Sequence, residues 1–267
     1  MTNLPKLTLR NPPVAIVLAQ FALAPSTSSQ VSHQLRELLK SVGLVRMTTK
    51  HERSVTLRPD SPTPDIRERV VTVFLDVNHE KGVSFDGSNL LCFTGNHKDF
   101  DSFLLFVSDI VQCTVTAKIN FVFTNIALRY INVFEIEDDC LDVMTESLRG
   151  MRWQDIGKPH HHHKYSFWCE TDRGRLDFRF ATEHGDRPPA DLGHAASVFS
   201  PKHLRSSDEI VGHLDIFESS KPSKDGFGWE KTKDYLIEMH QTIEAAFINA
   251  INPISLAERF GRTETLS

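Results

Sequence analysis

The sequence lacks the short motifs that identify common enzyme classes. No GxSxG nucleophile elbow, P-loop or GxGxxG before a helix occurs in its 267 residues. No cysteine and histidine stand at a known catalytic spacing. These absences argue against a common enzyme, although a rarer chemistry stays open.

Cysteine is scarce, and the sequence has no CxxC pair. Dispersed cysteines without metal-ligand spacing are typical of buried, reduced thiols. We therefore expect a buried, reduced thiol at each of Cys92, Cys113, Cys140 and Cys169.

Long apolar runs are also missing. The first residues, MTNLPKLTLRNPP, are polar and broken by proline, unlike a signal peptide. No run approaches the ~18 apolar residues that a membrane helix needs. We expect a cytoplasmic protein with no membrane segment.

Charge of one sign does not dominate. The chain has 30 basic and 35 acidic residues, a formal net charge of −5. This balance gives no overall bias toward nucleic acid, although a local basic face remains compatible with it. A hydrophobic content of 40% is enough for a core.

Two amphipathic helices stand out. The first follows Asn96, the expected N-cap, with Asp99 in the first turn, and its apolar stripe is Phe100, Phe103, Leu104, Val107, Ile110 and Val111. The second lies within 227–250, ends at Asn252-Pro253, and has the stripe Leu236, Met239, Ile243, Phe247 and Ala250. Stripes this long require a broad apolar partner, and a sheet face provides one.

Each of these helices closes a segment rich in strands. The N-terminal half, 1–118, is predicted as strand, short helix, several strands and long helix. The C-terminal half, 119–267, follows the same order with a loop at 183–207 rich in Pro, Gly, Ser and His. We predict an α+β fold in which two pseudo-equivalent halves form one curved antiparallel sheet, with the long helices packed on one face.

The element order of each half is similar to one half of the TATA-binding-protein fold. That resemblance lies in the order of elements and not in a sequence motif. It implies a fold and does not imply DNA binding, because function resides in sites and not in folds.

Three stretches resemble a sporadically distributed bacterial protein family of unknown function. They are PPVAIVLAQFAL near the start, LRYIN at 128–132, and LIEMHQTIEAAFINAI in the last helix. The family pattern has a tryptophan soon after this helix, where this chain continues NPISLAERFG. The resemblance implies a bacterial cytoplasmic protein, brings no catalytic residues, and hints at a defence-associated gene.

One candidate binding surface centres on Tyr130. Tyr130 and Asn132 stand two apart on a predicted strand and so point to the same face. If that face is exposed, Asp177 and Arg179 of a later strand join them in a surface. The alternative is that Tyr130 is a core aromatic with a satisfied hydroxyl. By the same reasoning His240, between Met239 and Ile243, is expected to be a core or border histidine with a hydrogen-bond partner.

A run of histidines, His160 to His163, is the candidate metal site. In an extended segment His160 and His162 point to the same side and could share a zinc or nickel ion. No HExxH or other ligand spacing accompanies them, so a solvated loop is the alternative.

The sequence therefore favours a non-enzymatic binding or interaction protein, with a protein partner or a homo-oligomer. An accessory or immunity-type role in bacterial defence is the expected setting. The alternatives are a metal-dependent hydrolase or nuclease using the 160–163 segment, and nucleic-acid binding on the open sheet face.

Overall fold

The protein is described here by a computed structural model. It describes residues 8–9, 13–24, 33–56, 65–117, 122–135, 143–145, 164–184, 210–258 and 261–263.

Strands outnumber helices along the described chain. In order they are β1 (Thr8–Leu9), β2 (Val14–Leu23), α1 (His33–Ser41), β3 (Arg46–Thr56), β4 (Asp65–Leu75), β5 (Lys81–Phe85), β6 (Asn89–Thr94), α2 (Phe100–Thr116), β7 (Phe123–Glu135), β8 (Lys164–Glu170), β9 (Gly174–His184), β10 (Ile210–Ser220), α4 (Trp229–Ala250), α5 (Pro253–Glu258) and β11 (Arg262–Thr263).

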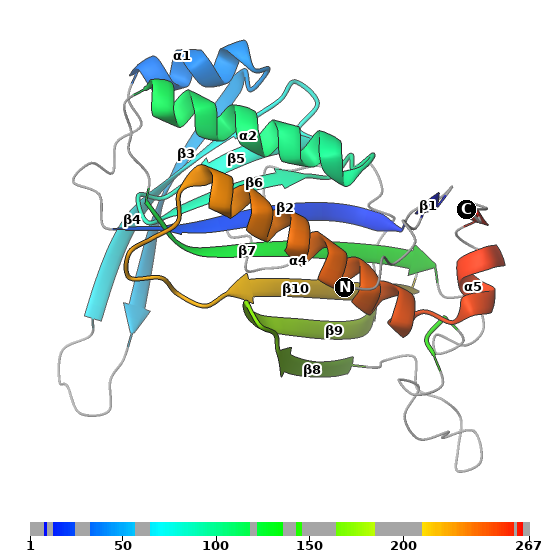
Figure 1. The fold of residues 1–267 in the computed structure, drawn as a ribbon. Helices are drawn as coiled ribbons and strands as arrows, with labels where there is room; N and C mark the ends of the chain where they lie inside the picture. Colours follow the sequence, from blue (N-terminus) through cyan, green and yellow to red (C-terminus); the bar gives the residue numbers. More distant parts are fainter. Residues whose placement is uncertain are drawn as a thin grey trace.

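A single nine-stranded sheet organises the described chain (Figure 1). Its order is β3-β4-β5-β6-β2-β7-β10-β9-β8, and every neighbouring pair is antiparallel. The predicted α+β class with an antiparallel sheet is therefore confirmed. The two-residue strands β1 and β11 pair separately.

The central strand β2 explains why the sheet has two apolar faces. Its sequence VAIVLAQFAL is almost continuously apolar, which is typical of a strand covered on both sides. Val17 and Phe21 pack in the main core, whereas Ile16 and Leu18 belong to a second buried cluster on the opposite face. The centre of the sheet is thus buried on both faces.

Helices α1, α2 and α4 pack apolar side chains into the main core on one face of the sheet. Leu39 of α1, Val107 of α2 and Met239 of α4 lie in the same buried cluster as Val17 and Leu128 of the central strands. Figure 1 shows these helices running across the sheet on one side. We call this the helix face and the opposite side the open face. None of the described helices is long and apolar enough to cross a membrane.

The start of α2 differs from the prediction. Asp99, and not Asn96, is the N-cap, because its Oδ1 accepts a hydrogen bond from the Ser102 amide at 2.7 Å. Asn96 instead donates its side-chain amide to Glu80 Oε2 at 2.9 Å. Either residue suits a cap by type, and the sequence alone does not show which one the turn brings into position.

The end of α4 follows the predicted break. The helix ends at Ala250, and Pro253 then occupies the first position of the short helix α5, where its missing donor costs nothing. The short helix of the C-terminal half is predicted after its first strand, with Leu141, Met144 and Leu148 as its apolar positions. That prediction is wrong at Met144, which forms a β-bridge to Ile251. Leu141 and Leu148 lie outside the described residues.

The cysteines only partly match the expectation. Cys92 and Cys113 are buried, and burial raises the pKa of both thiols. Cys169 is exposed because β8 is the last strand of the sheet, which alternation along one strand does not reveal. Cys140 lies outside the described residues. So does 185–207 of the predicted loop, whereas residues 183 and 184 belong to β9.

Candidate functional site

The strand register separates the four predicted binding residues into two groups. Tyr130 lies opposite Ile216, which lies opposite Phe178, so these three share the helix face. Asp177 and Arg179 flank Phe178 in β9 and therefore point to the open face. The condition for one combined surface, an exposed Tyr130, is not met.

Tyr130 and Asn132 are part of the core. Tyr130 is 6% exposed and packs in the main cluster. Asn132 is also buried and donates its side-chain amide to the Leu214 carbonyl at 3.1 Å. Both polar groups are therefore used internally.

Tyr130 belongs to a buried aromatic cluster formed by β7, α4 and the start of α2. Its hydroxyl lies 3.0 Å from His240 Nδ1. The His240 ring stacks on Phe100 with centroids 4.1 Å apart, and His97 meets the edge of Tyr130 at 5.5 Å. Burial, with a smaller contribution from Glu244, raises the pKa of Tyr130 well above its usual value. Tyr130 is therefore a neutral hydroxyl at physiological pH.

His97 is the least satisfied member of this cluster. Burial lowers the pKa of His97 to about 4, although Asp99 opposes the shift. No hydrogen-bond partner reaches its buried Nδ1 among the described residues. His97 is therefore neutral at pH 7, and its isolated position in the sequence gives no signal of this environment.

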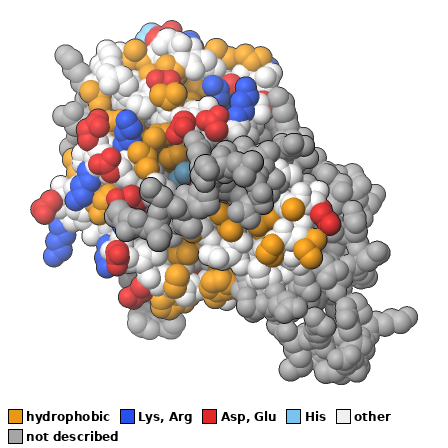
Figure 2. Space-filling model, turned by 45° about the vertical axis from the view of Figure 1, so that its right-hand side comes forward, with side chains coloured by type: hydrophobic (Ala, Val, Ile, Leu, Met, Phe, Trp, Pro, Cys, Tyr) orange, Lys and Arg blue, Asp and Glu red, His pale blue; other side chains and the backbone are white. Residues whose placement is uncertain are grey.

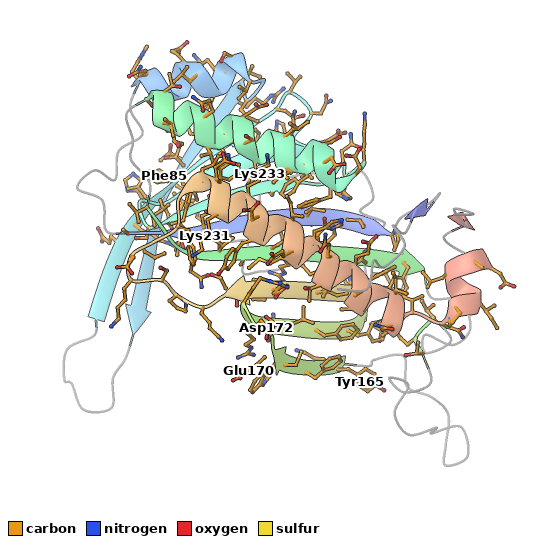
Figure 3. All side chains as sticks on the ribbon, in the orientation of Figure 1. Phe85, Tyr165, Glu170, Asp172, Lys231 and Lys233 are labelled. Carbon is orange, nitrogen blue, oxygen red and sulfur yellow. The ribbon has the colours of Figure 1, made fainter. Side chains whose placement is uncertain are left out.

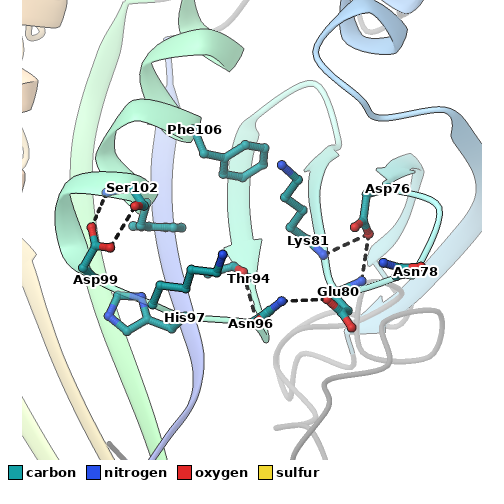
Figure 4. A pocket seen from close by; sticks show the side chains of 12 residues that line it. Asp76, Asn78, Glu80, Lys81, Thr94, Asn96, His97, Asp99, Ser102 and Phe106 are labelled. Carbon is teal, nitrogen blue, oxygen red and sulfur yellow. Dashed lines mark hydrogen bonds between the residues drawn. The ribbon is translucent and has the colours of Figure 1, made fainter. Parts of the chain in front are cut away.

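A pocket of about 310 Å³ adjoins His97 between the β4–β5 turn and the start of α2 (Figure 4). Its carboxylates hold the local backbone: Asp76 Oδ1 accepts from the amides of Glu80 at 2.8 Å and Lys81 at 3.2 Å. Lys81 points toward Phe106, with its Nζ 5.3 Å from the ring centroid. These contacts hold the β4–β5 turn beside the start of α2.

No metal centre is formed by the part of the chain that the structure describes, because no group of three or more His, Cys, Asp and Glu side chains is suitably placed there. The candidate ligands His160 and His162 lie outside the described residues. Zinc or nickel binding by this segment stays a prediction.

Strand β8, at one edge of the sheet, has the most exposed apolar side chains of the described strands. Strand β8 pairs with β9, and every β8 residue except Tyr165 is exposed. Phe167 is 43% and Trp168 is 57% exposed. Figure 3 shows β8 as the outermost strand, with Tyr165 and Glu170 toward its two ends.

Asp177 and Arg179 lie beside this edge strand. Trp168 is opposite Asp177, and Ser166 is opposite Arg179. The Arg175 guanidinium stacks over Trp168, 4.7 Å from its centroid, and also donates to Asp177 at 2.6 Å. We call Phe167, Trp168, Arg175, Asp177 and Arg179 the edge surface.

The edge surface contains one of the two predicted residue pairs. The sequence analysis did not identify Trp168 and Arg175 as candidate binding residues. Trp168 belongs to the predicted strand before the turn Asp172-Arg173-Gly174 and points to the opposite face from its neighbour Phe167. The missing information was strand order, since only that order places β8 outermost.

Comparison of the chain with protein-family models, curated proteins and solved structures found no match. The fold defines an α+β protein built on one antiparallel sheet. Its function must therefore be inferred from its own residues.

Proposed function

We propose that this chain is a non-enzymatic binding protein that contacts a protein partner through the edge surface. The supporting observation is a half-exposed tryptophan held in place on an edge strand, which pairs with β9 on one side and with no described strand on the other. Arg175 stacks on Trp168 and is itself held by Asp177. Residues that dominate binding at protein interfaces are enriched in tryptophan and arginine, and a preorganised anchor loses less entropy on binding.

The two edges of the sheet support this choice by contrast. The other edge strand, β3, carries the charged residues Arg46, Lys50 and Glu52, and such charges discourage pairing with another strand. Strand β8 is charged only at its ends, contains no proline, and pairs with β9 without a bulge. An edge of this kind accepts an added strand from a partner.

The two-half arrangement belongs to the same proposal. We infer that 1–118 and 119–267 are pseudo-equivalent halves of a sheet resembling the TATA-binding-protein fold, with the longer helices α2 and α4 in equivalent positions. In each half the last strand lies next to the first: β6 beside β2, and β10 beside β7. An experimental structure in which the halves superpose would support the inference, and two unrelated halves would overturn it.

The expected setting, a cytoplasmic accessory or immunity-type component in bacterial defence, follows from the family resemblance and stays a prediction. Nucleic-acid binding on the open face has less support. The formal net charge of the chain is −5, and on the side in view, which includes the helix face, Figure 2 shows basic and acidic side chains intermixed. Phosphate binding depends on concentrated positive charge.

Photo-crosslinking tests the proposed function. A photoreactive phenylalanine analogue replaces Trp168 in cells that express the chain at its natural level, and the products are identified by mass spectrometry. A defined protein adduct is expected from position 168. The matched control is Leu105 on α2, which is 67% exposed and lies outside the edge surface. No adduct beyond that of the Leu105 control would overturn the proposal.

A further inference from the structure

The sequence of β8 is complementary to its own reversed sequence. Lys164 begins the strand, Glu170 ends it, and Phe167 is in the middle. Lys164 lies opposite Ala181 and Glu170 opposite Arg175, and both point to the open face, whereas Phe167 lies opposite Phe178 on the helix face. Oppositely charged ends flanking a central aromatic residue are what antiparallel pairing with a second copy requires.

One register pairs all seven residues of β8 with their copies. It places Lys164 opposite Glu170 of the partner subunit, and Glu170 opposite Lys164 of the partner subunit. Phe167 then lies opposite Phe167 of the partner subunit on the two-fold axis. Every opposed pair shares a face, as an antiparallel ladder demands.

We propose that this protein forms a two-fold symmetric homodimer in which β8 pairs antiparallel with β8 of a second copy. The inference rests on the proposed function, because it identifies the partner at the edge surface. Such an interface is isologous, so the same strand supplies both sides of the contact. The two sheets join into one, with the helices of both copies on the same side.

The charges at the two ends of β8 favour a second copy of this chain as the partner, whereas exposure alone would fit any partner strand. In the fully paired register each strand end meets its opposite charge, whereas a parallel arrangement would place Lys164 and Glu170 each opposite its own kind. Like charges directly opposite one another destabilise a sheet, and opposite charges stabilise it. The sequence of β8 therefore favours the antiparallel self-pair.

Charge reversal provides the decisive test. The single variants Lys164→Glu and Glu170→Lys are purified separately and are studied alone and as an equimolar mixture. Sedimentation velocity gives the dimer dissociation constant. The wild-type chain is expected to dimerise. Each variant alone is expected to dimerise at least about tenfold more weakly, because two attractive pairs become repulsive. An equimolar mixture restores both pairs and should recover a heterodimer.

The result that overturns the inference is equally specific. A wild-type chain that stays monomeric at all concentrations, variants that dimerise as well as wild type, or a mixture that gives no heterodimer would each do so. Thermal unfolding of each variant checks folding, which both substitutions should preserve because both side chains are exposed.

Thiol mapping tests the register independently. Tyr165→Cys places a new thiol opposite the native Cys169 of the partner subunit, so mild oxidation should link the dimer covalently. Ser166→Cys also adds a thiol to β8 but lies opposite Trp168 of the partner subunit, and it should link far less. Equal linking by both variants would contradict the register.

The two proposals fail in different ways. A monomeric chain whose position 168 still crosslinks to a different protein would overturn the homodimer and leave the binding function standing. A chain that neither dimerises nor crosslinks at that position would overturn both.

Discussion

The hydrogen bond between Tyr130 and His240 allows a direct test of a single buried hydroxyl. Tyr130→Phe keeps the ring and removes the group that lies 3.0 Å from His240 Nδ1. We expect a loss of about 1–2 kcal/mol in the free energy of unfolding, since a buried partner loses its bond. Urea denaturation measures the change. Tyr235→Phe is the control, because Tyr235 is only partly buried and packs through its ring against Phe227. Equal effects of the two variants would contradict this role of Tyr130.

The pKa of His97 predicts how stability depends on pH. Folding lowers this pKa from 6.5 to about 4, so between these values the unfolded chain binds a proton that the folded chain does not. The contribution of His97 is therefore fully present above pH 6.5 and is lost as the pH falls toward 4. Each pKa unit corresponds to about 1.4 kcal/mol.

Urea unfolding of the wild type and of His97→Gln between pH 4 and pH 7 measures this contribution. The wild type should lose more stability on acidification than the variant, because glutamine does not titrate. Parallel pH profiles would show that His97 titrates alike in the folded and unfolded chains.

The residue-scale predictions from sequence succeeded where neighbours in the chain decide the outcome. The hydrogen-bonded position of the half-buried His240 follows from its place between Met239 and Ile243 on an apolar stripe. His97 was not predicted, because its environment is formed by Tyr130, a residue far away in sequence. A side chain that is buried by distant elements leaves no local pattern.

At the scale of elements, an ion pair joins the β8–β9 turn to α4. Arg173 donates to both carboxylate oxygens of Glu218, to Glu238 of α4 and, through a very short contact, to the Thr242 hydroxyl. Glu218 is fully buried, with 0% of its side chain exposed, and Thr171 donates a further bond to it at 2.8 Å. This network fixes the edge hairpin against the helix.

Removal of the Arg173 guanidinium should therefore be costly. Arg173→Met leaves a buried unpaired carboxylate and should destabilise the protein by about 3 kcal/mol in urea unfolding. Adding Glu218→Gln should recover part of this loss, since no charge then remains to be buried. Lys40→Met is the control: its ion pair with Glu37 joins two half-exposed side chains, and its loss should change the free energy of unfolding far less. Similar losses for the Arg173 and Lys40 variants would contradict the network.

The helices and strands were largely predictable from the sequence, whereas the order of the strands in the sheet was not. The stripes of α2 and α4 and the apolar run of β2 follow from periodicity. Strand order does not, because it depends on pairing between distant segments such as β2 with β7. For that reason the edge position of β8 and the exposure of Trp168 could not be predicted from the sequence.

At the scale of the whole molecule, the centre of the sheet is where the two predicted halves meet. Strands β2 and β7 pair along most of their length, and Leu128 of β7 is fully buried in the same cluster as Val17 of β2. Separating the halves would expose both strands and the core between them. We therefore expect 1–118 and 119–267 to unfold as one cooperative unit.

Probes in each half test this cooperativity. Trp229 at the start of α4 reports on the C-terminal half by fluorescence, and the buried thiol of Cys92 on β6 reports on the N-terminal half by its reaction with a thiol reagent. In a urea titration both signals should give the same midpoint, because coincident transitions are the mark of a two-state protein. The Cys113→Ser/Cys140→Ser/Cys169→Ser variant leaves Cys92 as the only thiol, so the signal reports on β6 alone. A Cys92 transition at clearly lower urea than the Trp229 transition would mean that the N-terminal half opens alone, and that β2–β7 pairing contributes little to holding the sheet together.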